Sequence, residues 1–349
     1  MQPMIEEIYQ TLTTMIGEKD GTPQSVWLRR YEPGKDSSEN QFVTFLKPEA
    51  TAVQAGVDVK GILQIVFDAL SRWNVEVGAV RLLNARYLEY YQIMDQHYGV
   101  INNISRHGFD AISATAREVL QKDFGSDLAS GAEVLGGHQF LERFPAFSPF
   151  ALATIADNLG SKKLAGGTYC LRLKVEGQIF LILNAFHPFQ LEHFTAQGKV
   201  IVILETRSKT SWAILRQQLV GATIPANAAE GSIRRTLLNR HEELHMPDVS
   251  PGNNGVHLSA GPLEGMVELQ RFCSEPEKGS QLDLRETCFG RLLLSKGLPQ
   301  NLLTELAKNP TLEIDGRSIS AFDLTEEMDS DPAAEKLIAL ARSGTIHTA

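Results

Sequence analysis

Hydrophobic and polar residues follow two different periods along this chain, and each period predicts one type of secondary structure. Residues 3–16 and 59–72 have apolar positions three and four residues apart, which predicts helices. Residues 41–46 and 75–83 are short, apolar and rich in β-branched side chains, as strands are. The mainly polar residues 18–40 read as a connecting segment. The order strand, helix, strand indicates an α+β fold of the ferredoxin-like sandwich type.

The rest of the chain contains further regular segments. They are helical at 87–98 and 111–122, strand-like at 169–175, 178–185 and 200–205, and helical again at 282–294, 299–309 and 331–342. Glu176 and Gly177 separate two of the strand-like runs, which predicts a β-hairpin. No internal repeat or low-complexity tract interrupts this pattern.

Composition is that of an ordinary soluble globular protein, with 43% hydrophobic and 21% charged residues in a chain of 349. This length suits one large domain or two. No apolar run reaches the roughly 18 residues that a membrane helix needs, so we expect no membrane partner. The acidic N-terminus lacks the pattern of a secretory signal, which favours a cytoplasmic protein.

Three cysteines, Cys170, Cys273 and Cys288, are too few and too scattered for a disulfide framework or a zinc site. We therefore expect reduced thiols. The net charge of −9 disfavours broad contact with nucleic acid, which requires clustered Lys and Arg. An acidic protein can still bind a nucleotide through a few local cations.

Two separated motifs carry the most specific information. Residues 219–272 contain Gly-x-Thr-x-Pro, then Gly-Ser-Ile-Arg, then Asn-x-x-His-x-Ser, and residues 42–50 read FVTFLKPEA. In this order they resemble the nucleoside diphosphate kinase family, which opens on a strand ending in Lys-Pro-[DE] and carries its catalytic residues in the later segment. The matching positions are Gly221, Thr223, Pro225, Gly231, Ser232, Ile233, Arg234, Asn254, His257, Ser259 and Glu268.

The resemblance implies a ferredoxin-like nucleoside diphosphate kinase core with an inserted α/β segment and helical terminal extensions. The implied organisation is an N-terminal helix and linker at 1–40, the first part of the core at 41–109, an insertion at 110–198, the second part of the core with the catalytic histidine at 199–272, and a C-terminal helical extension at 273–349.

The resemblance makes His257 the phosphate carrier of a ping-pong transfer from a nucleoside triphosphate to a nucleoside diphosphate. An imidazole suits this task because it is largely neutral at physiological pH and nucleophilic. Glu268 matches the glutamate that holds the ring in one tautomer, a role analogous to the carboxylate of a catalytic triad. Lys47 and Ser259 complete the catalytic residues that the resemblance implies.

Cations are expected around the transferring phosphoryl group, whose charge is spread over three oxygens. Lys47 and Arg234 match the family directly. Arg216 lies one residue farther from the Gly-x-Thr motif than the family's arginine does. Arg106, in RHGF, resembles the arginine of R-P-F-F, but the proline is missing and Phe109 is displaced by one, so a surface arginine is an equal alternative.

The resemblance also implies hydrogen bonds from Thr223 to a phosphate and from Asn254 to a sugar hydroxyl. Tyr98 is expected near the histidine, with Tyr90 and Tyr91 as alternatives. Mg²⁺ would be held mainly by the nucleotide phosphates, because this hard ion keeps several waters and needs few protein ligands. The chain has no glycine-rich phosphate loop of the G-x-x-x-x-G-K-[ST] type.

Some features depart from the family pattern. After the histidine the family has Gly/Ala-Ser-Asp-Ser, whereas this chain has Leu258, Ser259, Ala260 and Gly261, so an aspartate is missing. The loop before Asn254 is longer than in compact members of the family. The resemblance therefore allows a homo-oligomer but does not imply the family's usual hexamer. The insertion and the missing aspartate leave two alternatives open: transfer to a non-nucleoside acceptor, or a catalytically weak nucleotide-binding regulatory protein.

Overall fold

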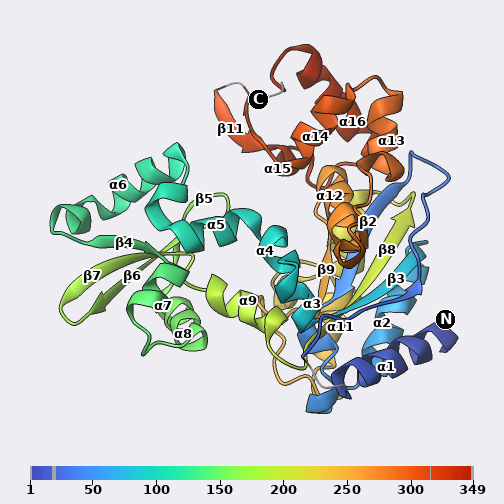
Figure 1. Ribbon diagram of the computed structural model, residues 1–349, viewed down its shortest axis with the longest axis horizontal. Helices are drawn as coiled ribbons and strands as arrows, with labels where there is room; N and C mark the ends of the chain where they lie inside the picture. The colour runs from blue at the N-terminus through green and yellow to red at the C-terminus, as the bar shows by residue number, and fades with distance from the viewer. Residues whose placement is uncertain (1, 18–20, 315, 347–349) are drawn as a thin grey trace. The chain divides into compact units, whose positions relative to one another are not determined.

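The computed structural model describes residues 2–17, 21–314 and 316–346, which form two compact units (Figure 1). The first unit contains Met1–Tyr91 and Gln197–Ala349, and the second contains Gln92–Ala196. The second unit starts at Gln92, before the insertion that was predicted at 110–198. That prediction placed the start of the insertion at the point where the family pattern ends. The division of the chain into five functional segments stays a prediction. Within the described residues, no helix combines the length and the apolar character needed to cross a bilayer.

A five-stranded antiparallel sheet forms the centre of the first unit, in the order β1-β3-β8-β2-β9. Its strands are β1 (Ser25–Arg29), β2 (Asn40–Leu46), β3 (Glu76–Asn84), β8 (Val200–Ser208) and β9 (Val256–Leu258). Without β1, the chain order across the sheet is second, third, first and fourth strand, which is the ferredoxin-like arrangement. The predicted α+β, ferredoxin-like fold class is confirmed.

The prediction of a mere connecting segment at 18–40 is wrong, because Ser25–Arg29 forms the edge strand β1. This strand is short and half-buried, and in the described part of the chain it pairs with β3 alone, across a register irregularity between Trp27 and Arg29. A short edge strand with a bulge shows little alternation, so its sequence does not stand out. Residues 18–20 of the predicted segment lie outside the described residues.

Two helices pack on one face of the sheet, and their bounds confirm the predicted periods. They are α1 (Gln2–Gly17) and α2 (Val59–Arg72), the latter capped by Asp58, whose carboxylate accepts the amide of Gly61. Their buried side chains form one core with alternate residues of the strands, including Phe42 and Leu46 of β2. Phe45, which directly precedes Leu46, points to the opposite face and contacts Phe272 of α12 (Pro262–Cys273).

The C-terminal extension builds a second core on α12. Its elements are α13 (Cys288–Ser295), α14 (Gln300–Ala307), β10 (Thr311–Ile314), β11 (Arg317–Ser320), α15 (Ala321–Thr325) and α16 (Ser330–Arg342). Leucines of these helices cluster with Leu263 and Met266 of α12. The predicted helices at 299–309 and 331–342 are confirmed, whereas the run 282–294 is helical only from residue 284 onward, in two pieces. The hairpin β10–β11 was not predicted.

The second unit has its own four-stranded sheet, in the order β4-β7-β6-β5. Its elements are α4 (Ile93–His97), α5 (Gly99–His107), α6 (Ala114–Ala129), β4 (Glu133–Gly136), α7 (Gly137–Arg143), α8 (Pro149–Leu159), β5 (Lys162–Ala165), β6 (Thr168–Val175), β7 (Gln178–Leu183) and α9 (His187–Thr195). Alternate residues of β7 belong to two different apolar clusters, so helices cover both faces of this sheet.

The hairpin between β6 and β7 is confirmed, and its turn residues Glu176 and Gly177 both have positive φ, at 50° and 88°. The predicted helix at 87–98 is interrupted. It consists of α3 (Ala85–Tyr90) and α4, because Gln92 adopts a left-handed conformation with φ 52°. The helix predicted at 111–122 begins farther along the chain, at Ala114, and is α6.

Candidate active site

The alternation of strand β9 sets the direction of His257. Val256 and Leu258 on either side of it belong to the core beneath the sheet, so the imidazole points to the face that α12 covers. His257 pairs with Phe45 across the strands, and the two rings stack with centroids 4.5 Å apart and an interplanar angle of 20°. The side chain keeps 19% of its surface exposed. The ring is therefore both fixed and accessible.

A buried carboxylate holds one nitrogen of this ring. Glu268, on α12, has no exposed surface, and its two oxygens lie 2.9 and 3.0 Å from His257 Nε2. Because an ionised carboxylate can only accept hydrogen bonds, the imidazole proton resides on Nε2. The lone pair that can attack an electrophile is then on Nδ1.

Ser259 fixes the carboxylate in turn. Its hydroxyl donates to Glu268 Oε2 at 2.5 Å and accepts the amide of Val43 at 3.0 Å. The Ser259 carbonyl accepts the indole Nε1–H of the fully buried Trp212 at 3.0 Å. The predicted residues His257, Glu268 and Ser259 therefore form one connected network that is anchored to β2.

A cavity of about 440 Å³ brings together three more of the predicted residues, Arg216, Thr223 and Arg234. We call it the arginine cavity. Its lining residues are Arg216, Gln217, Gln218, Gly221, Ala222, Thr223, Asn227, Ala229, Arg234 and Glu327. All of them belong to the first unit.

Two arginines of this cavity bind the carbonyl groups that flank the histidine. Arg234, near the start of α11 (Ile233–Asn239), donates to Val256 O at 3.0 Å, and Arg216 donates to Leu258 O at 3.0 Å. Burial and the nearby charge of Arg216 lower the pKa of Arg234 to about 10, so it remains charged at neutral pH. Its Nε has no hydrogen-bond partner among the described residues. Two positive charges thus lie on either side of His257 along the backbone.

The offset of Arg216 from the family spacing has a local structural counterpart. Residues Leu215–Val220 form a π-helix, in which the amide of Gly221 bonds to the carbonyl of Arg216, five residues back, at 3.0 Å. A π-turn accommodates one residue more than an α-helical turn, and such turns are frequent at functional sites. Gly221, with φ 91°, then ends the helix.

Lys47 and Asn254 lie on neighbouring segments. Lys47 follows β2, and its amide bonds to Gly255 O at 3.0 Å, two residues before the histidine. Burial, followed by the charge of Arg234, lowers the pKa of Lys47, while the carboxylate of Glu49 opposes this change. The buried Asn254 donates to the carbonyls of Thr223 at 3.2 Å and Pro251 at 3.1 Å. Its Oδ1 has no hydrogen-bond partner in the part of the chain that the structure describes.

The remaining predicted residues, Tyr98, Arg106 and Phe109, belong to the second unit. Arg106 forms an ion pair with Asp95 at 2.9 Å, and the ring of Tyr98 meets His187 edge-on. Their roles around a phosphate stay predictions. Of the alternatives to Tyr98, Tyr90 and Tyr91 lie in the first unit, and the ring of Tyr90 is largely exposed.

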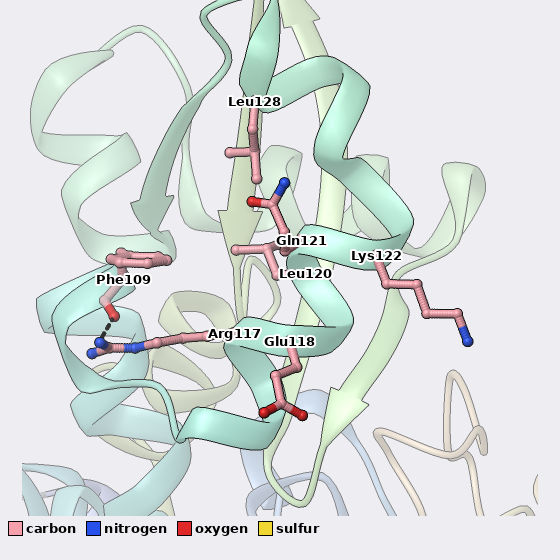
Figure 2. Close-up of a pocket in the computed structure, with 7 residues that line it drawn as sticks. All are labelled: Phe109, Arg117, Glu118, Leu120, Gln121, Lys122 and Leu128. Atoms are coloured by element: carbon pink, nitrogen blue, oxygen red, sulfur yellow. Dashed lines mark hydrogen bonds between the residues drawn. The ribbon is translucent and has the colours of Figure 1, made fainter.

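Phe109 lines a cavity of about 550 Å³ within the second unit, whose other lining residues come from α6 (Figure 2). The guanidinium of Arg117 lies 4.8 Å from the centre of the Phe109 ring and donates to its carbonyl oxygen. This contact is a cation–π pair on the surface of the second unit.

Three residues of the site were missed from the sequence. Phe45 could have been found, because the alternation of β2 puts it on the face of His257. Glu264 lies at the start of α12 and accepts the amide of Ala260 at 2.7 Å. Burial and the nearby carboxylate of Glu268 raise the pKa of Glu264 to about 8. Glu327 comes from the C-terminal extension, and no local sequence signal connects it to the cavity.

A histidine held by a carboxylate beside two arginines, on a ferredoxin-like sheet, is typical of a protein that handles phosphate groups. The chain is 34% identical over 108 residues to a nucleoside diphosphate kinase of Rhizobium rhizogenes, which covers 30% of this chain and 67% of that protein. It is 31% identical over 110 residues to the enzyme of that name from Xanthobacter autotrophicus (31% and 69% covered), and 30% identical over 132 residues to that from Rhizobium etli (36% and 83% covered).

A crystal structure of an NDP kinase from Pyrobaculum aerophilum aligns with 68% of this chain and 97% of its own, at 17% identity and a TM-score of 0.33. No family model matches the chain. On the strength of the sequence relatives, the chain belongs to the nucleoside diphosphate kinase family.

Proposed function

We propose that this protein transfers the γ-phosphate of a nucleoside triphosphate to a nucleoside diphosphate through a phosphohistidine at His257. One observation carries the proposal: Nε2 of an accessible imidazole is held by the buried Glu268, which puts the lone pair on Nδ1. The names of the relatives support nucleotides as the substrates.

In the first half-reaction, the lone pair of Nδ1 attacks the γ-phosphorus and forms a P–N bond. The bond from this phosphorus to the β,γ-bridging oxygen breaks, and the nucleoside diphosphate leaves with that electron pair. The imidazole becomes positively charged, which the carboxylate of Glu268 stabilises through Nε2–H. In the second half-reaction, an oxygen of another diphosphate attacks the same phosphorus, and the P–N electron pair returns to Nδ1.

The surrounding residues would act by electrostatics and positioning. Arg216, Arg234 and Lys47 would bind the phosphate oxygens, where the charge of the transition state accumulates. Thr223, which lines the arginine cavity, would donate its hydroxyl to a phosphate. The Oδ1 of Asn254, which lacks a partner among the described residues, would accept a ribose hydroxyl.

Mg²⁺ would arrive as part of the nucleotide substrate, where it neutralises phosphate charge. The donor set of the arginine cavity fits such a complex, because Glu327 offers carboxylate oxygens, which Mg²⁺ prefers, and Arg216 and Arg234 offer donors to the phosphates.

Incubation with γ-labelled ATP followed by GDP tests the proposal. We expect label on the protein, its quantitative transfer to GTP on addition of GDP, and loss of both signals in His257→Ala. Tight nucleotide binding without labelling would instead favour the regulatory alternative. Labelling that persists in His257→Ala, with the same transfer to GDP, would refute the role of this residue.

A further inference from the structure

The C-terminal extension is fastened to the core next to the arginine cavity. The side chain of Asn40 donates to Asp329 Oδ1 at 3.0 Å, and its own carbonyl accepts the amide of Ser330 at 3.0 Å. Asp329 Oδ1 also accepts the amide of Trp212 at 2.6 Å. All these groups are largely buried. The segment preceding Asp329 therefore has a defined position relative to the cavity.

Glu327 is held in the cavity wall by its backbone and its side chain. Its amide donates to Ala260 O at 2.9 Å, and its Oε2 accepts the side-chain amide of Gln217 at 2.8 Å. Its φ is 56°, a conformation that a residue other than glycine rarely adopts unless its surroundings fix it. The segment just before Glu327 also packs closely on the chain at Gly261. A Cβ at Gly261 would lie 2.4 Å from the carbonyl oxygen of Thr325, so this position has no room for a side chain. The position of this carboxylate is thus a specific feature of the fold.

This carboxylate faces the cation on which phosphate binding would depend. Arg216 lies 3.5 Å from an oxygen of Glu326 and 4.0 Å from an oxygen of Glu327. Glu327 lines the arginine cavity with Arg216 and Arg234. A polyphosphate that enters the cavity must therefore compete with carboxylates for Arg216.

We propose that Glu327 is a specificity-determining residue that makes the site select metal-complexed nucleotides over metal-free ones. A bare polyphosphate is repelled by the Glu327 carboxylate and loses part of the attraction to Arg216. When the nucleotide carries Mg²⁺, the same carboxylate interacts with a cation, directly or through the waters that the ion keeps. This inference deepens the proposed function and depends on it, because it assumes that nucleotide phosphates occupy the arginine cavity.

Calorimetric titration with ADP, in EDTA and in excess Mg²⁺, tests the inference on the full-length protein. For Glu327→Gln we expect metal-free ADP to bind about threefold to tenfold more tightly than to the wild type, the range expected for a partly solvated charge pair. Binding of Mg-ADP should be unchanged or weaker. Glu327→Asp should restore the wild-type preference for Mg-ADP, because it keeps the charge.

Glu335→Gln is the matched control, since it removes the same charge from an exposed position of the same extension, where the carboxylate pairs with Lys296. It should leave both affinities unchanged. Should Glu327→Gln unfold, Glu327→Asn provides a second neutral variant, because asparagine tolerates positive φ.

An unchanged preference for Mg-ADP in the neutral variants would overturn the inference. An equal gain in affinity for metal-free ADP and Mg-ADP would overturn it too, because Glu327 would then only obstruct the cavity. If neither the wild type nor the variants bind Mg-ADP, the proposed function fails as well. The two failures are therefore distinguishable, because only the second removes nucleotide binding from the wild-type protein.

Discussion

Replacing Glu268 with glutamine tests the proposed role of this carboxylate in orienting His257 for attack. The carboxylate is fully buried, within 3.0 Å of His257 Nε2 and 2.5 Å of Ser259 Oγ. Glutamine has the same shape, but it has one acceptor oxygen and no charge. One of the two donors, Nε2–H or the serine hydroxyl, then faces an amide NH₂ group.

The size of the effect follows from the bond that is lost. A hydrogen bond to a charged group contributes about 1.5–3 kcal/mol, and the transition state depends on it more than the ground state does, because the imidazole gains positive charge during attack. A loss of about 2–3 kcal/mol corresponds to phosphorylation that is about 30-fold to 150-fold slower. Nucleotide affinity should change little, since Glu268 does not line the arginine cavity.

Rapid-quench measurement of single-turnover labelling by γ-labelled ATP gives this rate directly. Glu264→Gln is the matched control: it changes the same type of side chain on the same helix, but its carboxyl group accepts the amide of Ala260 and does not bond to the histidine. We expect it to label within about threefold of the wild-type rate. Thermal denaturation checks that both variants are folded. A wild-type labelling rate in Glu268→Gln, or an equal loss in both variants, would refute the reasoning.

Three further predictions concern the surroundings of the site. Arg234→Met should weaken ADP binding, measured by titration. It should also lower the free energy of unfolding by about 2–4 kcal/mol, because it removes the hydrogen bonds to Gly221 O and Val256 O. An unchanged affinity for ADP would contradict the proposed role of Arg234 in phosphate binding. Trp212→Phe, which loses the bond to Ser259 O, should cost about 1–3 kcal/mol in urea denaturation, and a neutral result would exclude that contribution. In the folded protein the pKa of Glu264 is raised from 4.5 to about 8, so its ionisation disfavours the folded state. The free energy of unfolding of the wild type, relative to that of Glu264→Gln, should therefore be greatest below pH 4.5 and fall as the pH rises toward 8. Parallel curves of stability against pH for the two proteins would contradict the raised pKa.

Much of the fold could be predicted because its signals are local. The helical spacing of 59–72 gives the bounds of α2 as the structure has them, and the pair Glu176-Gly177 marks the β6–β7 turn. The edge strand β1 escaped prediction because it is short, half-exposed and bulged. The break at Gln92 escaped because a left-handed residue there has no strong sequence signature.

The residues of the site also differ in whether a local sequence pattern indicates them. His257 on β9, Ser259 directly after this strand and Glu268 on α12 lie within twelve residues, so a local motif indicates their grouping, and the structure brings them together. Glu327 is different: it lines the cavity only because the extension docks at Asn40 and Trp212, a long-range event that no local pattern reveals.

The position of the phosphoryl group on the imidazole of His257 tests the proposed phosphohistidine most directly. The protein, phosphorylated with ATP and denatured in alkali, can be examined by ³¹P NMR and by fragment mass spectrometry. Because Glu268 holds Nε2, we expect acid-labile phosphate on Nδ1 of His257. Phosphate on Nε2, or on any other residue, would contradict it.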